Sequence, residues 1–279
     1  MMTKELTLGF SPCPNDTFMF YPLVHGLVDT GDMAYRERLE DVETLNQLAR
    51  AGELDVSKVS YHAFGYIRDE YALLRSGSAL GRGCGPLLVA SEKFDPCTLR
   101  DKTIAVPGRY TTALLLMRLF DPALDNFIVM PFNEIMNAVL SGSVDAGLII
   151  HESRFTYHAL GLHKLLDLGE WWEGDTGLPL PLGGIVARRS LGSKTITAVE
   201  QALKAGVEYA RFHPAEAARY ISEHAQEMSP EVCTAHIALY VNDFSTDLGD
   251  EGVQAITCLL QRAEQAGIIP ASAVPLFMT

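Results

Sequence analysis

The sequence predicts an α/β protein of two domains, with mixed, mostly parallel sheets and a cleft between the domains. Strand-like and helix-like segments alternate along almost the whole chain, which is typical of this class. A similar stretch occurs twice, at residues 49–61 and 139–151. Stretches rich in Gly or Pro, at 81–96 and 178–193, flank a middle segment with strand–helix units of its own.

The repeated stretch indicates where the cleft lies. ARAGELDVSKVSY and VLSGSVDAGLIIH each pass from a helix end through Gly and Asp into a strand. Aligning Asp55 with Asp145 sets Tyr61 opposite His151, so both residues follow the carboxyl end of a strand. Open α/β sheets bind ligands outside these ends, so we expect two similar domains that face one cleft. The alternative is that Gly-x-aliphatic-Asp is an ordinary helix-to-strand loop.

The flanking stretches give the expected boundaries. We expect a larger α/β domain from residues 1–90 and 187–279, and a smaller one from residues 91–186. The chain would cross between the domains twice, and two crossing strands make a plausible hinge.

The first domain shows its expected elements in order, each marked by its hydrophobic period and by turn residues. They are a strand at 6–10, a helix at 16–27 made irregular by Pro22, a helix at 40–52 closed by Gly52, a strand at 54–60 and a helix at 61–74.

Composition excludes several kinds of partner. The 279-residue chain carries a net charge of −13, which argues against binding nucleic acid. No apolar run approaches the ~20 residues that span a bilayer, and no basic leader with an apolar core precedes the first strand. The five cysteines form no C-x-x-C pair, so we expect neither a disulfide framework nor a zinc site. We therefore expect a cytoplasmic protein.

The loop SPCPNDTF (11–18) leaves the first strand and is a candidate substrate contact. Its two prolines would hold Ser11, Asn15 and Asp16 in preset positions. Asn15 or Asp16 could instead cap the following helix. Metal or redox chemistry at Cys13 is a further alternative.

Other candidate site residues follow the later strands. Lys58 and Ser60 share one strand face and could hold an anionic or hydroxylated substrate, or Lys58 could point to solvent. His151 at a strand end could act as a general base, or form an ordinary loop hydrogen bond. Thr111 or Thr112 lies near a helix N-terminus, which favours either an anion or simple capping.

The remaining motifs limit the chemistry. No P-loop, dinucleotide fingerprint, G-x-S-x-G or H-E-x-x-H motif occurs, so we expect neither a nucleotide cofactor nor a metal. Trp171 and Trp172 could line a flat apolar slot, although core packing is the usual role of such residues.

Several blocks of the chain together resemble one family. SPCPNDTF, LEDVETLN, VPGRYTTA, GLIIHESRFTY and GLPLPLGGIVARR occur in order, and they look like the 1,4-dihydroxy-6-naphthoate synthase family of the futalosine route to menaquinone. The resemblance covers essentially the whole chain. One departure is Tyr110, where the family pattern leads us to expect His.

The resemblance implies a two-domain fold like that of type II periplasmic binding proteins. It implies a cofactor-independent lyase that converts cyclic dehypoxanthinyl futalosine, a small-molecule carboxylate, to 1,4-dihydroxy-6-naphthoate. His151 would be the proton acceptor, and Lys58, Val59, Ser60, Thr112 and Ala113 would line the substrate site. The alternatives are a chorismate dehydratase-like lyase and a non-catalytic solute-binding protein of the same fold.

Overall fold

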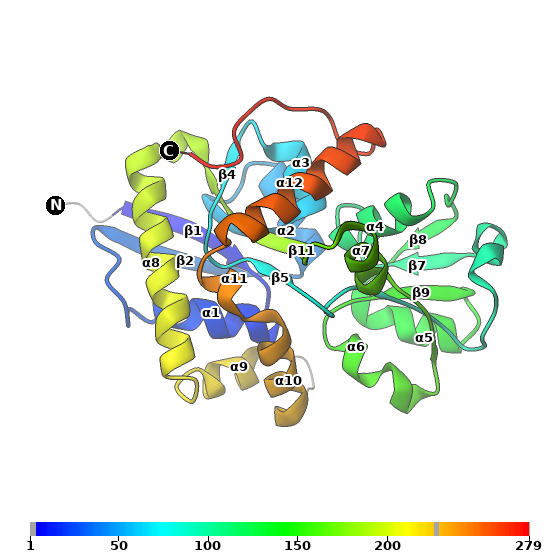
Figure 1. Cartoon of the computed structure of the whole chain (residues 1–279). Helices are drawn as coiled ribbons and strands as arrows, with labels where there is room; N and C mark the ends of the chain where they lie inside the picture. The colour runs from blue at the N-terminus through cyan, green and yellow to red at the C-terminus, as the bar shows by residue number, and fades with distance from the viewer. Residues whose placement is uncertain (1–3, 226–228, 279) are drawn as a thin grey trace.

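The protein folds into two lobes, each built around one β-sheet (Figure 1). The computed structural model describes residues 4–225 and 229–278. The chain begins and ends in the larger lobe, so the smaller lobe is an excursion from it.

The larger lobe contains a six-stranded sheet in the order β2-β1-β3-β11-β4, with β5 also paired to β11. Strand β1 runs parallel to β2 and β3, whereas β11 runs antiparallel to β3, β4 and β5. The strands are β1 (Lys4–Phe10), β2 (Met33–Leu39), β3 (Val56–Ser60), β4 (Tyr71–Leu73), β5 (Ala79–Gly81) and β11 (Leu180–Arg188).

The smaller lobe contains a five-stranded sheet in the order β10-β6-β9-β7-β8. Strand β7 is parallel to β8 and β9, and β6 is antiparallel to β9 and β10. Its strands are β6 (Leu87–Ala90), β7 (Ile104–Val106), β8 (Phe127–Val129), β9 (Ala146–Ile149) and β10 (His163–Asp167).

Both sheets are mixed, as the sequence predicts, but antiparallel pairing takes a larger share than expected. The parallel pairs join β1 to β2 and β3, and β7 to β8 and β9, and all of these strands belong to strand–helix units. The antiparallel pairs all involve β6 or β11, the two strands that follow the crossings between the lobes.

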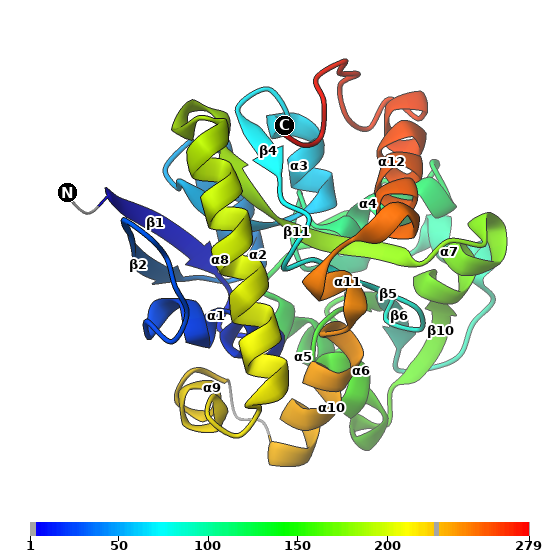
Figure 2. The same ribbon diagram turned by 60° about the vertical axis from the view of Figure 1, so that its left-hand side comes forward.

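Helices cover the faces of both sheets, and the longest, α8, runs along the larger lobe (Figure 2). Within the described residues no helix has both the length and the apolar character to cross a membrane. The larger lobe carries α1 (Pro14–Val24), α2 (Val42–Arg50), α3 (Tyr61–Ile67), α8 (Ser193–Phe212), α9 (Ala218–His224), α10 (Pro230–Tyr240), α11 (Asp243–Thr246) and α12 (Gly249–Gln265). The smaller lobe carries α4 (Thr112–Phe120), α5 (Ile135–Leu140), α6 (Ser153–Thr156) and α7 (Leu168–Thr176). Short 3₁₀ turns occupy Pro96–Asp101, Phe132–Glu134, Tyr157–Leu160 and Arg189–Leu191.

The helix expected at 61–74 is wrong in its second half. Helix α3 ends at Ile67, and residues 71–73 form strand β4. These residues pair with the end of β11, and all three are buried. Pairing with a distant strand therefore outweighs the local helical pattern.

The repeated stretch has the same structure in both lobes. Gly52 and Gly142 follow α2 and α5 with φ of 70° and 72°, a backbone conformation that glycine adopts without strain. The carboxylate of Asp55 then accepts the backbone N–H of Thr7 at 2.9 Å, and that of Asp145 accepts the N–H of Thr103 at 2.8 Å. Each Asp therefore ties the start of its own strand to a neighbouring strand.

The chain crosses between the lobes at residues 82–86 and 177–179, because β5 and β11 join the larger sheet whereas β6 joins the smaller one. Strand β6, which the expected boundary after residue 90 assigns to the larger domain, pairs within the smaller sheet. Strand β11 begins at Leu180, before the expected boundary at 187, and pairs within the larger sheet. We propose that the hinge lies at these two crossings.

One hydrophobic cluster continues from the larger lobe into the smaller through α3, α12, α4 and α7. Trp172 is fully buried within this cluster, and its indole N–H donates to the carbonyl of Pro179 at 3.1 Å. Trp171 packs edge-on against Phe120. Both tryptophans are thus packing residues, and neither lines the cavity described below.

Candidate active site between the lobes

A cavity of about 80 Å³ lies between the two lobes. Nine residues expected from the sequence or from the family resemblance to contact substrate line it, although they come from four separate segments of the chain. These residues are Ser11, Asn15, Asp16, Lys58, Val59, Ser60, Thr112, Ala113 and His151. The structure thus brings the candidates together, and their roles remain predictions.

Four strands deliver these residues to the cavity from their carboxyl ends. Strands β1 and β3 of the larger lobe end at Phe10 and Ser60, next to the first loop and the start of α3. Strands β7 and β9 of the smaller lobe lead to the start of α4 and to His151. The arrangement follows the rule that open α/β sheets bind ligands at this edge.

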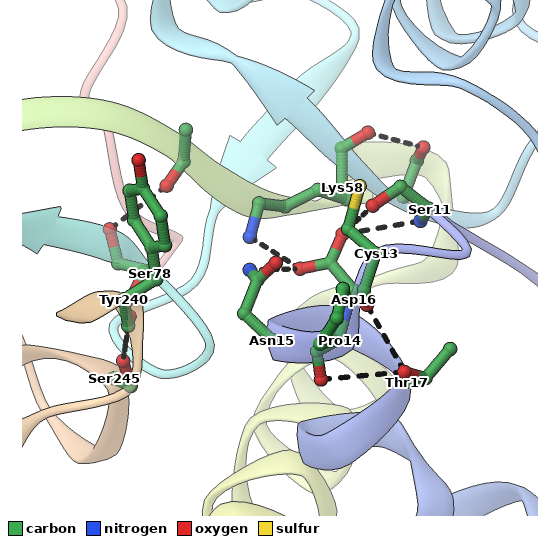
Figure 3. A network of polar contacts seen from close by, with 12 residues as sticks. Ser11, Cys13, Pro14, Asn15, Asp16, Thr17, Lys58, Ser78, Tyr240 and Ser245 are labelled. Carbon is green, nitrogen blue, oxygen red and sulfur yellow. Dashed lines mark hydrogen bonds and ion pairs between the residues drawn. The ribbon is translucent and has the colours of Figure 1, made fainter. Parts of the chain in front are cut away.

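The carboxylate of Asp16 is the centre of a buried polar network (Figure 3). Its Oδ1 accepts from Nζ of Lys58 and from Nδ2 of Asn15, both at 2.9 Å. Its Oδ2 accepts from the hydroxyl of Ser11 at 2.7 Å and from the Ser11 N–H at 3.2 Å. Four donors on one carboxylate fix Ser11, Asn15 and Lys58 relative to one another.

The network also balances charge. Burial by itself would raise the pKa of Asp16, but the Lys58 ammonium and the hydrogen bonds from Lys58 and Ser11 outweigh it and lower the pKa. Asp16 is therefore ionised, and it neutralises the positive charge of Lys58. The alternative that Lys58 points to solvent is wrong, because the side chain is only 6% exposed.

The alternative that Asn15 or Asp16 caps the first helix is also wrong. Helix α1 begins two residues earlier than expected, at Pro14, and its N-cap residue is Cys13, which makes no side-chain capping bond. Proline suits the first helical position because the N–H that it lacks would have no partner there. The Asp16 side chain is thus used within the network, where its negative charge also suits the first turn of a helix.

Asn46 is a supporting residue that the sequence did not indicate. Its Oδ1 accepts the N–H of Ser60 at 2.8 Å, and its Nδ2 lies 3.1 Å from the Ser60 hydroxyl. The same Nδ2 lies 3.3 Å from the carbonyl oxygen of Tyr110 in the smaller lobe. Asn46 therefore holds Ser60 in place and joins it to the opposite side of the cavity.

The start of α4 faces the cavity from the smaller lobe. Thr111 is the N-cap, and its hydroxyl accepts the N–H of Leu114 at 3.3 Å. The hydroxyl of Thr112 donates to the carbonyl of Leu182 at 2.5 Å, across the lobe boundary. Thr111 thus takes the capping role, while the first N–H groups of α4, at Thr112 and Ala113, lie at the cavity wall.

His151 has an unusual backbone conformation. Its φ is 55°, and it is the one non-glycine residue with positive φ within residues 4–225 and 229–278. The left-handed region costs an L-residue roughly 1–2 kcal/mol. The strain falls between the end of β9 and the start of α6, at the residue expected to act as the base, and such strain is often found at functional sites.

The environment of His151 keeps its imidazole neutral. Burial lowers the pKa of His151 most, and the carboxylates of Glu152 and Asp16 oppose the shift without reversing it. A neutral imidazole has one nitrogen with a lone pair, so it can accept a proton. The ring packs edge-on to Phe132, with 5.3 Å between the ring centres.

Two further cavity residues come from α10, an element to which the sequence analysis gave no role. His236 and Tyr240 lie one turn apart on this helix, and both are buried. In Figure 3 the Tyr240 side chain lies to the left, apart from Lys58 and Asn15. Two polar aromatic residues at i and i+4 on a mostly apolar helix are the signal that could have identified them.

Within the part of the chain that the structure describes, no three or more His, Cys, Asp or Glu side chains are grouped to hold a metal ion.

Comparison with known proteins identifies the family. Residues 6–265 match the family described as menaquinone biosynthesis. A relative from Streptomyces coelicolor named 1,4-dihydroxy-6-naphthoate synthase is 50% identical, over 97% of both chains. A relative of the same name from Thermus thermophilus is also 50% identical, over 99% of this chain and 100% of its own.

Solved structures support the fold. A crystal structure from Archaeoglobus fulgidus matches with a TM-score of 0.88 at 37% identity, over 95% of this chain and 98% of the other. A Candida albicans protein described as having the generic periplasmic binding protein fold matches with a TM-score of 0.66 at 19% identity, over 96% of this chain and 92% of the other. The predicted periplasmic-binding-protein-like fold is thus confirmed, and the chain belongs to the 1,4-dihydroxy-6-naphthoate synthase family of menaquinone biosynthesis.

Proposed function

We propose that this protein converts cyclic dehypoxanthinyl futalosine to 1,4-dihydroxy-6-naphthoate, as a carbon–carbon lyase that needs no cofactor. The names of the two relatives at 50% identity support the product. The observation that carries the mechanism is a neutral His151 at a cavity whose other walls offer hydrogen-bond donors and a helix N-terminus.

The substrate carboxylate would bind at the start of α4. The ammonium of Lys58 is already neutralised by Asp16, so Lys58 has no free charge to offer. The N–H groups of Thr112 and Ala113 and the helix dipole favour an anion at this position. The hydroxyl groups of the sugar-derived ring would then meet the polar wall that Ser11, Asn15 and Ser60 form.

His151 would start the reaction by accepting a proton next to a ketone or alcohol of the substrate. The electron pair left behind begins the elimination that breaks the carbon–carbon bond, expels the sugar-derived fragment and makes the second ring aromatic. The Glu152 carboxylate would favour the imidazolium that forms, because it already raises the proton affinity of His151.

Binding would require the lobes to separate and close again. The cavity of about 80 Å³ is far below the 300–1,000 Å³ that is usual for ligand pockets. We infer that the substrate enters while the lobes are apart, by bending at residues 82–86 and 177–179. Closure then shields the reactive intermediate from water.

The direct test is to incubate the purified protein with cyclic dehypoxanthinyl futalosine and to follow naphthoate formation by chromatography and mass spectrometry. We expect turnover by the wild type and a loss of about 10²–10⁴-fold in kcat for His151→Ala. His158→Ala is the matched control, because His158 is an exposed histidine in the next turn. No naphthoate from the wild type would refute the activity, and a normal rate for His151→Ala would refute the base.

Two other functions are distinguished by the same preparation. Chorismate consumption, with no turnover of the futalosine substrate, would indicate a chorismate dehydratase-like lyase. Tight binding of a ligand without turnover would indicate a solute-binding protein of the same fold. Fractionation of the native cells tests the predicted cytoplasmic location separately.

A further inference from the structure

His236 is a buried histidine whose polar atoms are unused. The side chain has 0% exposure. Within residues 4–225 and 229–278, neither Nδ1 nor Nε2 has a hydrogen-bond partner, and no other side chain has two such buried atoms. Leaving a buried polar atom unpaired costs about 1–3 kcal/mol, so this arrangement needs an explanation.

The position of His236 suggests one. The residue lines the cavity from α10, and its ring centre lies 6.2 Å from that of His151. Tyr240 packs edge-on at 4.7 Å, and Phe155 of α6 lies at 6.3 Å. Figures 1 and 2 both place α10 beside α6, at the junction between the lobes. Aromatic packing thus holds the ring beside that of His151 at the cavity, and within the described residues its two nitrogens are left for a ligand.

The chemistry of the ring selects the ligand group. Burial above all, together with the proximity of His151, lowers the pKa of His236 to about 3, so the ring is neutral. A neutral imidazole offers one N–H donor and one lone pair. A hydroxyl group both donates and accepts, so it can use either nitrogen. A carboxylate only accepts hydrogen bonds, so it would bind better at the start of α4, where several backbone N–H groups can donate to it.

We propose that His236 is a further substrate-binding residue, whose imidazole forms a hydrogen bond with a hydroxyl group of the bound substrate beside His151. The identity of the hydroxylated substrate rests on the proposed function. The two imidazoles then have different roles, one in proton transfer and one in orienting the hydroxylated ring.

The experiment compares two replacements of His236. His236→Phe keeps an aromatic ring and removes both polar atoms, whereas His236→Gln keeps a donor and an acceptor. For turnover of cyclic dehypoxanthinyl futalosine, we expect kcat/KM to fall about tenfold in the Phe variant, as for one lost hydrogen bond. We expect a smaller loss in the Gln variant. His213→Phe is the control, because the His213 side chain is 51% exposed.

Stability separates a binding role from a packing role. The Phe variant removes two unpaired polar atoms from a buried site, so its urea midpoint should equal or exceed that of the wild type. A Phe variant that is stable and turns over within twofold of the wild type would overturn the proposal. A Gln variant no more active than the Phe variant would also overturn it, because the rescue by polar atoms would be absent.

Calorimetric titration of the cyclic substrate distinguishes failure of this inference from failure of the proposed function. The His151→Ala variant should bind the substrate without turnover, and adding His236→Phe should weaken Kd about tenfold. If the wild type makes no naphthoate, the proposed reaction fails, while a weakened Kd still supports His236. Equal Kd values for the two variants, or no binding by either, overturn the role of His236.

Discussion

The thiol sulfur of Cys13 lies 3.6 Å from Nδ1 of His151, although the two residues belong to different lobes. Burial raises the pKa of Cys13, and the Glu152 carboxylate raises it further, so the sulfur carries a neutral thiol. When Nδ1 carries the ring hydrogen and donates it to the sulfur, Nε2 keeps its lone pair and can take a proton. With this tautomer, Cys13 would orient the expected base. Metal or redox chemistry is not needed to explain its place in the loop.

This contact can be tested by changing Cys13 alone. Cys13→Ala removes the partner of Nδ1, so we expect kcat to fall about tenfold with little change in KM. Cys13→Ser keeps a hydroxyl that can replace the thiol and should retain more activity. Cys97→Ala serves as the control because Cys97 is an exposed cysteine. Full activity of Cys13→Ala would show that the sulfur does not orient the ring.

The buried pair of Lys58 and Asp16 should control stability. Their side chains are 6% and 2% exposed, so Lys58→Met leaves a buried carboxylate without its cation. We expect the free energy of unfolding to fall by about 3–5 kcal/mol, measured with urea. The double change Lys58→Met with Asp16→Asn should recover part of this loss.

The exposed pair of Arg36 and Glu5 provides the control for that measurement. Its side chains are both 69% exposed, so Arg36→Met should change the free energy of unfolding by less than about 1 kcal/mol. If Lys58→Met and Arg36→Met lower the free energy of unfolding equally, the buried pair contributes no more to stability than the exposed pair.

The parts of the site that follow strand ends could be predicted from the sequence. Hydrophobic runs ending in polar residues mark Ser11, Ser60 and His151, and the carboxyl ends of strands meet at one edge. The Cys13–His151 contact could not be predicted, because it depends on how the two lobes meet. His236 was missed for a related reason, because α10 reaches the cavity only through tertiary packing, here that of the larger lobe.

Local patterns also misled where distant groups compete. Asp16 looks like a helix cap, yet Lys58 provides a stronger partner for its carboxylate, and the helix starts at Pro14 instead. Residues 71–73 continue a helical pattern, yet pairing with β11 makes them a strand. In both places a residue more than 40 positions away decides the structure.

Glu43 should favour the closed arrangement of the lobes. Its carboxylate, at the start of α2, accepts the N–H groups of Arg109 and Tyr110 in the smaller lobe at 3.0 and 3.1 Å. Hydrogen bonds to a charged group are worth about 1.5–3 kcal/mol each, so Glu43→Ala should shift the ligand-free protein toward an open form. Small-angle X-ray scattering should then report a larger radius of gyration. Glu53→Ala is the control, because Glu53 is exposed, and it should leave the radius of gyration unchanged. An unchanged radius for Glu43→Ala would show that the Glu43 contact does not hold the lobes closed.

The pH profile of the reaction should reflect the environment of His151. Only the neutral ring accepts a proton, so kcat/KM should rise with pH as His151 loses its proton. Burial lowers the pKa of His151 below its ordinary value of 6.5, so more than half of the protein is already active at pH 6.5. The half-maximal point should therefore lie below pH 6.5, and a half-maximal point above it would contradict the base assignment.

The backbone strain at His151 should reverse the usual order of glycine and alanine. At a φ of 55° glycine is unstrained, whereas alanine retains the cost of the left-handed region. We therefore expect His151→Gly to be more stable than His151→Ala by about 1 kcal/mol in urea unfolding, although both lack the base and should lose most of their activity. At the exposed position Gln201 in α8, the alanine variant should instead be the more stable by about 1 kcal/mol. If alanine is also the more stable at position 151, the residue does not hold this conformation in solution, and the strained placement of the base is wrong.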